Sequence, residues 1–206
     1  MPRKTKKIAV RDEFLILTNG RRTEKNYFEA VRSNYKSIFK ISVKFMNDDP
    51  IALVKHAIAE KSSRNRVWCV FDRDEFRSVS IGEAMKLADE NSIGIAFSNM
   101  AFEVWLIDHF EKCSAEKSAE KLIADLDRIL KANEYSKGYA KEDRQMIEKI
   151  LMSRLLDAVH NADVVMQNKI LQHKESHNNE NYPFCEWNSF TSVHKLIDAL
   201  KLENRS

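Results

Sequence analysis

The feature that most constrains the fold is the apolar run at residues 67–71, which leads directly into Asp72 and Asp74. A short continuous run of apolar residues is typical of a strand buried on both faces, as in the parallel sheet of an α/β protein. Side chains two positions apart on a strand point to the same side, so the two carboxylates are directed together at its carboxyl end. Ligands of open α/β sheets bind at that end.

Two carboxylates this close repel each other unless a cation or a proton lies between them. Mg²⁺ binds one or two carboxylates and keeps several waters, which makes Asp72 and Asp74 candidate ligands of Mg²⁺, or of Mn²⁺ in its place. The alternative is a surface turn after the strand, because Asp is also common in turns.

Strand and helix patterns alternate through the first half of the chain. Apart from the strand that ends at Asp72, the predicted strands are 13–18, 39–46 and 92–97. The predicted helices start near Thr23, capped by its hydroxyl, at 50–61 and at 81–91. This alternation predicts a mainly parallel sheet flanked by helices. Right-handed crossovers then bring Asn19-Gly20, the Asp72 strand end and Ser98-Asn99 to one rim of the sheet.

The second half is nearly all helical in pattern. The predicted helices are 100–110, 115–131, 142–160 and 190–201, and the polar stretch 173–189 is predicted to be a mobile loop. We therefore expect an α/β domain at residues 1–112 and a helical region at 113–206 packed on it. Asn99 is expected to cap the helix that starts near Met100.

Composition excludes several classes of protein. The chain has 206 residues, 43% of them hydrophobic, so it can bury a core of its own. Its net charge of +3 is too balanced to indicate nucleic-acid binding by itself. The three cysteines have neither zinc-site nor disulfide-framework spacing, and no apolar stretch approaches the roughly 18 residues of a membrane span. We expect a cytoplasmic protein that does not enter a membrane.

Four segments in order resemble the RloB-like family. They are residues 14–28 (FLILTNGRRTEKNYF), 70–75 (VFDRDE), 97–110 (FSNMAFEVWLIDHF) and 191–196 (TSVHKL). The resemblance implies a Toprim-like fold, the metal-binding α/β domain of topoisomerases, primases and OLD-type nucleases. RloB-like proteins are also similar to the Toprim proteins of antiphage abortive-infection systems such as AbiL and PARIS. It thus implies a Mg²⁺-dependent nuclease that works with an ABC-type ATPase partner, with tRNA or another nucleic acid as substrate.

One position departs from the family pattern. The family usually has Glu-Gly after the first strand, where this chain has Asn19-Gly20. An amide cannot act as a general base, so either catalysis is lost or another acid takes the role. Glu24, in the first turn of the following helix, and Glu103 are the candidates, and Glu24 is also a candidate metal ligand. For both glutamates the alternative is a favourable charge at a helix N-terminus, or a buried ion pair for Glu103.

A lysine and several arginines complete the candidate site. Lys137 is a candidate for stabilising a phosphate, because OLD-type nucleases use a lysine beyond their Asp-X-Asp; the alternative is a solvated surface lysine. Arg21, Arg22 and Arg73 are candidates for contacts with phosphate oxygens.

Three functions are consistent with these residues. The first is a Toprim-type nuclease of a phage-defence system. The second is a catalytically impaired Toprim module, with Asn19 in place of the usual glutamate, that binds a partner or a nucleic acid. The third is a nucleotide-binding or nucleotidyl-transferring protein of the same fold.

Overall fold

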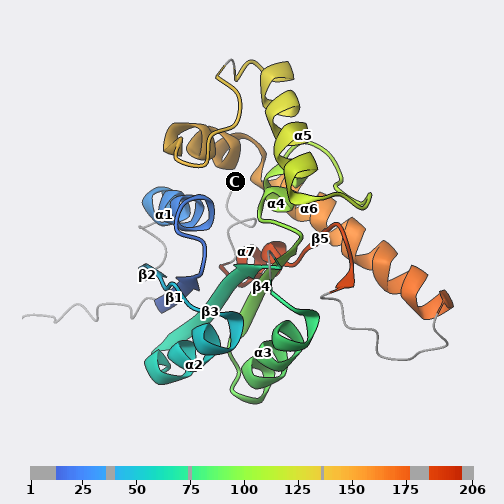
Figure 1. The fold of residues 1–206 in the computed structure, drawn as a ribbon. Helices are drawn as coiled ribbons and strands as arrows, with labels where there is room; N and C mark the ends of the chain where they lie inside the picture. The colour runs from blue at the N-terminus through green and yellow to red at the C-terminus, as the bar shows by residue number, and fades with distance from the viewer. Residues whose placement is uncertain (1–12, 36–39, 74–75, 136, 177–185, 201–206) are drawn as a thin grey trace, which may run out of the picture.

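The computed structural model describes residues 13–35, 40–73, 76–135, 137–176 and 186–200. The strands are β1 (Glu13–Thr18), β2 (Lys40–Phe45), β3 (Asn65–Asp72), β4 (Gly94–Asn99) and β5 (Phe190–Thr191). The helices are α1 (Thr23–Tyr35), α2 (Pro50–Glu60), α3 (Ser78–Glu90), α4 (Glu103–Asp108), α5 (Ala119–Ala132), α6 (Arg144–Ser176) and α7 (Val193–Leu200). The predicted parallel α/β sheet with a helical second half is confirmed (Figure 1).

The strands form one sheet in the order β2-β1-β3-β4-β5. The first four are parallel, and β5 pairs antiparallel with β4. Thr18, the last residue of β1, lies opposite Phe45 of β2 and Val70 of β3, so these three strands end at the same edge. Because β1 lies between β2 and β3, this edge contains the point at which the strand order reverses, where ligands of such sheets bind.

Two hydrophobic cores cover the two faces of the sheet. Phe14 and Ile16 of β1 belong to the core under α1, α4, α5, α6 and α7. Leu15 and Leu17 belong to the core under α2 and α3. Alternate residues of a strand point to opposite faces, so a strand between two layers of helices must be apolar at every position. The apolar runs of β1 and β3 meet that requirement.

Local sequence explains where α2 begins. The side chain of Asp49 accepts hydrogen bonds from Ile51 N and Ala52 N, each 2.9 Å long, and Pro50 occupies the first helical turn. An Asp cap followed by Pro is the usual chemistry of a helix start, as predicted. In α1, by contrast, the cap position belongs to Arg22, whose carbonyl accepts from Asn26 N, and not to Thr23.

The second half returns to the sheet. Residues predicted as one helix at 190–201 instead form β5, which pairs with Ser98 and Asn99, and then α7. The hydroxyl of Ser192 accepts a hydrogen bond of 2.9 Å from Phe97 N. A two-residue strand is too short to show an alternating pattern, so no periodicity predicts it.

Two other boundaries differ from the prediction. The helix expected at 142–160 extends to Ser176 with a kink at Arg154, so residues 173–176 are helical; residues 177–185 lie outside the described ranges. The helix expected at 100–110 is the shorter α4, which follows Phe102. Asn99 is therefore the buried last residue of β4 and does not cap that helix. Among the described residues, no helix has both the length and the apolar character needed to cross a membrane.

Two glycines provide a matched test of the packing. A Cβ atom added to Gly94 would lie 2.3 Å from the indole of Trp68, whereas a Cβ atom on Gly82 in α3 would meet nothing within 4 Å. We expect Gly94→Ala to lower the free energy of unfolding by about 1–3 kcal/mol through overpacking. Gly82→Ala should raise it by about 0.5–1 kcal/mol, because Gly is a poor helix former. Urea denaturation measures both, and equal effects of the two variants would contradict the packing described here.

Candidate functional site

A cleft of about 360 Å³ lies at the edge where β1 and β3 end. Its lining mixes acids, cations and amides: Asn19, Gly20, Arg21, Arg22, Thr23, Glu24, Asn47, Asp48, Asp72, Phe76 and Lys141. These residues come from the turn after β1, the start of α1, the turn after β2, the end of β3 and the segment before α6. The sheet therefore gathers side chains that are up to 122 positions apart, from Asn19 to Lys141, at one edge.

The turn after β1 is held against β3. Asn19 N donates a 3.2 Å hydrogen bond to Val70 O, and the hydroxyl of Thr18 donates to Gly20 O over 3.1 Å. The bond from Asn19 extends the pairing with β3 one residue beyond the end of β1, before the chain turns into α1. Asn19 and Gly20 consequently line the cleft, as predicted from the parallel topology.

Glu24 lies on the floor of the cleft, with only 6% of its surface exposed. Its carboxylate lies directly over Gly20, because a Cβ atom built on that glycine would be 1.8 Å from the carboxyl carbon of Glu24. Gly20 is thus needed for close approach of the side chain to the backbone. The position of Glu24 in the first turn of α1 also places its negative charge where the helix dipole favours it.

Asp72 is the last residue of β3 and lines the same cleft. It pairs with Ser98 in β4, and the next amide, Arg73 N, donates to Ser98 O over 2.9 Å. The backbone on both sides of Asp72 is therefore fixed by the sheet. Asp74, the second acid of the predicted pair, lies outside the described residues.

Glu103 lies behind the cleft at the start of α4 and is 1% exposed. Its Oε1 accepts a 2.6 Å hydrogen bond from the hydroxyl of Tyr139 and lies 3.4 Å from Lys141 Nζ. Burial first, and then the negative charge of Glu103, raise the pKa of Tyr139 far above its usual value. Tyr139 therefore keeps its proton and acts as a donor to Glu103, so the buried carboxylate is satisfied.

Residues 137–143, between α5 and α6, cross over to α1. Tyr139 N donates to Asp127 Oδ1 of α5 over 2.9 Å, and the hydroxyl of Tyr139 lies 3.2 Å from that of Thr23 in α1. The same segment accepts a hydrogen bond from Asn26 at Lys141 O, and Glu142 forms an ion pair with Arg22. The segment thus connects α5 to the first turns of α1 and forms one wall of the cleft.

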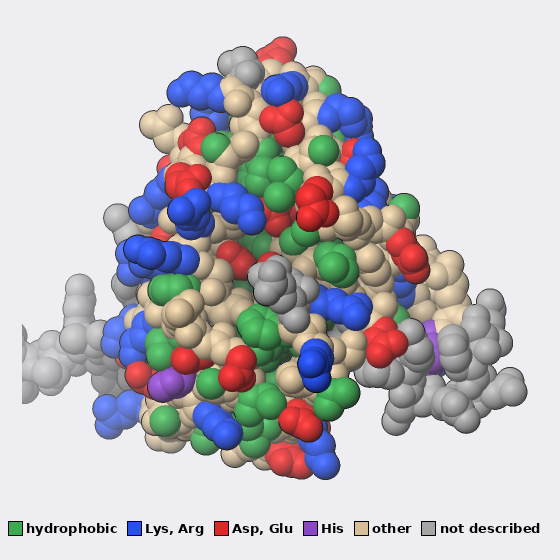
Figure 2. All heavy atoms as spheres, viewed as in Figure 1, with side chains coloured by type: hydrophobic (Ala, Val, Ile, Leu, Met, Phe, Trp, Pro, Cys, Tyr) green, Lys and Arg blue, Asp and Glu red, His purple; other side chains and the backbone are tan. Residues whose placement is uncertain are grey.

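Positive side chains surround the opening of the cleft. Arg21, Arg22 and Lys141 line it and are exposed. Figure 2 shows Lys and Arg side chains gathered over α1 and the start of α6, with acidic side chains between them. An anionic ligand such as a phosphodiester would meet these cations before it reached the acids on the floor.

The donors in the cleft fit a hydrated divalent cation better than a closed metal cage. Within the described ranges, no three His, Cys, Asp or Glu side chains are placed to hold a metal ion together. Glu24 and Asp72 nevertheless line one cleft with the amide of Asn19. Mg²⁺ usually binds through one or two carboxylates and retains several waters, which this set of oxygen donors can satisfy.

Of the predicted site residues, the structure brings Asn19, Glu24 and Asp72 to one cleft and places Glu103 directly behind it. Lys137 lines a different pocket. Tyr139 and Lys141 were not predicted to be part of the site. They are more than 100 residues from Glu24 in the chain, and no local pattern marks contacts over such a separation.

An aromatic cluster fixes α1 and α4, which carry the two buried glutamates. His109 lies fully buried beside Tyr27 and Trp105. Its Nδ1 donates to Trp105 O over 2.9 Å, since a carbonyl only accepts, and its Nε2 accepts from the Tyr27 hydroxyl over 3.2 Å. Burial favours the neutral imidazole, which can form both of these bonds.

One comparison with known proteins gives a match. The family model described as RloB-like protein matches residues 14–200. Searches of curated proteins and of solved structures found no significant match.

Acid should destabilise the fold through His109. Burial lowers the pKa of His109 from 6.5 to about 4. Between these values the unfolded chain binds a proton and the folded chain does not, so the free energy of unfolding falls as pH drops through this window. The loss amounts to about 3 kcal/mol for a shift of this size. Urea denaturation at pH 7 and pH 4.5 measures it. His109→Gln should reduce the dependence without removing it, because burial also lowers the pKa of His194 to about 4. Titration of the His109 ring near pH 6.5 by NMR would refute this account.

Proposed function

Since the chain belongs to the RloB-like family, we propose that it is a divalent-metal-dependent nuclease that cleaves phosphodiester bonds in RNA or DNA. The observation that carries the proposal is the shared cleft at the edge of the sheet where β1 and β3 end, which Glu24 and Asp72 line together with exposed cations. Acids and cations in one cleft suit a substrate that is itself an anion and reacts with the help of a metal ion.

The residues of the cleft have separate tasks in this proposal. Glu24 and Asp72 would hold Mg²⁺ or Mn²⁺, which would polarise the phosphate as a Lewis acid and lower the pKa of a bound water. Arg21 and Lys141 bind the phosphate oxygens and orient the scissile bond. Asn19 contributes only a neutral oxygen or an amide donor. Among the described residues of the cleft, the carboxylates that could accept the proton from the attacking water are Glu24, Asp48 and Asp72.

Tyr139 acts as a positioning residue. Its hydrogen bonds join Glu103 to α1 and to the segment that carries Lys141. Lys141 is itself anchored by Glu103, so its ammonium group is held at the cleft wall rather than left free to move. A fixed cation costs less reorganisation when charge develops on the phosphate.

The wider role in this proposal comes from the family resemblance. The chain would act as the Toprim-like nuclease of an antiphage abortive-infection system and would be controlled by an ABC-type ATPase partner. A Toprim-like assignment is supported by the parallel sheet with acids at the carboxyl ends of its strands. That support is at the level of fold and site chemistry.

Removal of either carboxylate should abolish cleavage. With Mg²⁺ or Mn²⁺, the purified protein is expected to cut RNA or DNA, and Asp72→Asn and Glu24→Gln should each lower the rate about 100-fold or more. Gel analysis of labelled oligonucleotides measures the rate. Glu90→Gln, on the exposed end of α3, is the matched control and should cleave normally.

A further variant tests whether cleavage depends on where the Glu24 carboxylate lies, and not only on its being present. Gly20→Ala keeps every acid but moves the Glu24 carboxylate away from the backbone, and should reduce cleavage about 10- to 100-fold. Full activity of Asp72→Asn, or of both Glu24→Gln and Gly20→Ala, would exclude this site as the nuclease centre.

Asn19 supports a second candidate function, a catalytically impaired module that binds a partner or a nucleic acid. Asn19 lines the cleft beside the two acids, where the family usually has a glutamate. If the amide of Asn19 limits metal binding or cleavage, Asn19→Glu should tighten Mn²⁺ binding about tenfold or create measurable cleavage. Isothermal titration calorimetry and the oligonucleotide assay measure the two effects. Unchanged metal affinity and unchanged activity would argue against impairment at this position.

A further inference from the structure

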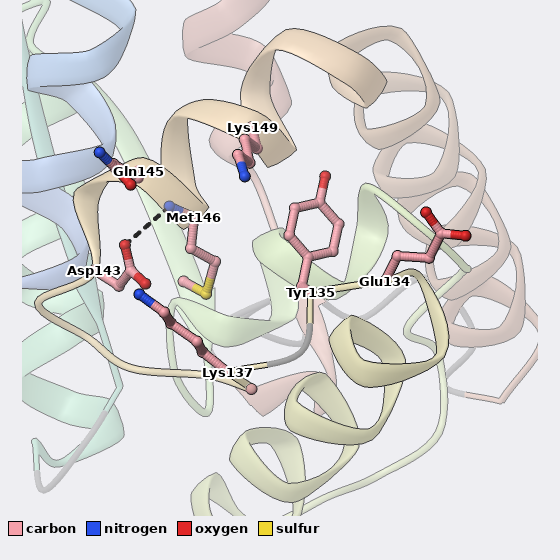
Figure 3. A pocket seen from close by; sticks show the side chains of 8 residues that line it. Glu134, Tyr135, Lys137, Asp143, Gln145, Met146 and Lys149 are labelled. Carbon is pink, nitrogen blue, oxygen red and sulfur yellow. Dashed lines mark hydrogen bonds between the residues drawn. The ribbon is translucent and has the colours of Figure 1, made fainter.

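A second pocket, of about 130 Å³, lies between the end of α5 and the start of α6 (Figure 3). Its lining is Glu134, Tyr135, Lys137, Gly138, Asp143, Gln145, Met146 and Lys149. None of these residues has a task in the cleavage proposed above. Lys137 was a candidate for stabilising a phosphate at the candidate active site, but it lines this separate pocket instead.

The pocket has an apolar slot. Figure 3 shows the ring of Tyr135 on one side and the side chain of Met146 on the other. The backbone of Tyr135 is held in the turn after α5, because its N–H donates to Leu130 O over 2.9 Å and its carbonyl accepts from Gly138 N over 3.0 Å. Its ring packs against the main core, so it presents a fixed aromatic face. A slot between an aromatic ring and a thioether suits a planar, polarisable ligand.

Two lysines flank this slot. Lys137 and Lys149 are exposed, and within the described part of the chain neither forms an ion pair. The acids of the pocket, Glu134 and Asp143, neutralise the positive charges of the two lysines only in part. Asp143 accepts a 3.1 Å hydrogen bond from Met146 N at the start of α6, and Glu134 extends away from the lysines in Figure 3. A planar ligand in the slot would therefore have cations available for an attached phosphate.

The pocket and the cleft share one wall. Lys137 lines the pocket and Lys141 lines the cleft, and the two lysines are four positions apart in the chain. Four residues span at most about 14 Å, so a ligand of a few nucleotides reaches from one to the other. Exposed cations line both: Lys137 and Lys149 line the pocket, and Arg21, Arg22 and Lys141 line the cleft.

We propose that this pocket binds one unstacked base of a single-stranded nucleic acid, with Tyr135 stacking on the base and Lys137 and Lys149 contacting its phosphates. The proposal rests on the nuclease function and defines its substrate as single-stranded at this position. A base in a duplex cannot enter the slot, because neighbouring bases cover both of its faces. An unpaired base has free faces, and proteins usually bind it by stacking it on aromatic side chains.

The test measures binding without cleavage. Fluorescence anisotropy in EDTA, with the full chain carrying Asp72→Asn, compares a labelled 12-nucleotide RNA or DNA strand with the same strand in a duplex. We expect the single strand to bind at least about tenfold more tightly at moderate salt. Tyr135→Ala should weaken that binding about tenfold, and Tyr135→Phe should retain it, because the stacking face remains.

The lysines provide an independent readout. The double variant Lys137→Ala/Lys149→Ala should weaken binding and reduce the slope of log affinity against log salt by about 1.4, as expected for the loss of two phosphate contacts to a single strand. Lys55→Ala, an exposed lysine on α2, is the matched control and should change neither value.

Both proposals can fail separately. Equal affinity for duplex and single strand, or unchanged binding in Tyr135→Ala and in the lysine pair, overturns the pocket assignment even if the protein cleaves nucleic acid. Conversely, the expected changes in binding by a chain that never cleaves would keep the pocket and remove the nuclease.

Discussion

The parallel pairing of β1 with β2 on one side and β3 on the other is the constraint on which the rest of this structure depends. That pairing ends the three strands at one edge and sends α1 and α3 to opposite faces of the sheet. The result is a crevice at the point where the strand order reverses. Everything assigned to the site, from Asn19 to Asp72, lies at that crevice because of strand register and not because of nearness in the sequence.

Two buried glutamates, Glu24 and Glu103, lie at or directly behind the cleft and need specific partners or space. Glu24 is accommodated because Gly20 leaves room for its carboxylate. Glu103 is accommodated because the Tyr139 hydroxyl donates to it and Lys141 forms an ion pair with it. A carboxylate without such partners would be costly to bury, so the segment before α6 is as much a part of the site as the sheet. The same segment lies between the cleft and the second pocket, so the proposed metal site and the proposed base-binding pocket are neighbours.

The sequence predicted the features that follow from local patterns. Apolar runs identified β1 and β3, and their polar ends identified Asn19 and Asp72 as neighbours across the sheet. Glu24 was a candidate because it follows in the first turn of the next helix and because the family pattern lacks its usual acid at Asn19. Patterns could not reveal contacts between distant segments, such as Tyr139 with Glu103, or the pairing of β5 with β4 through only two residues. The cap predicted at Asn99 was wrong, because β4 continues through that residue and α4 starts only after Phe102. Helix α6 exceeded its predicted length, since polar residues at 173–176 carry no signal that ends a helix.

The central claim is that Glu24 and Asp72 hold one divalent cation between them. Anomalous diffraction from crystals of this protein soaked in Mn²⁺ tests it most directly. The account predicts a peak in the cleft about 2.0–2.2 Å from a carboxylate oxygen of each residue, with waters completing the coordination. Fully occupied Mn²⁺ found elsewhere on the protein, with none between these two carboxylates, would contradict it.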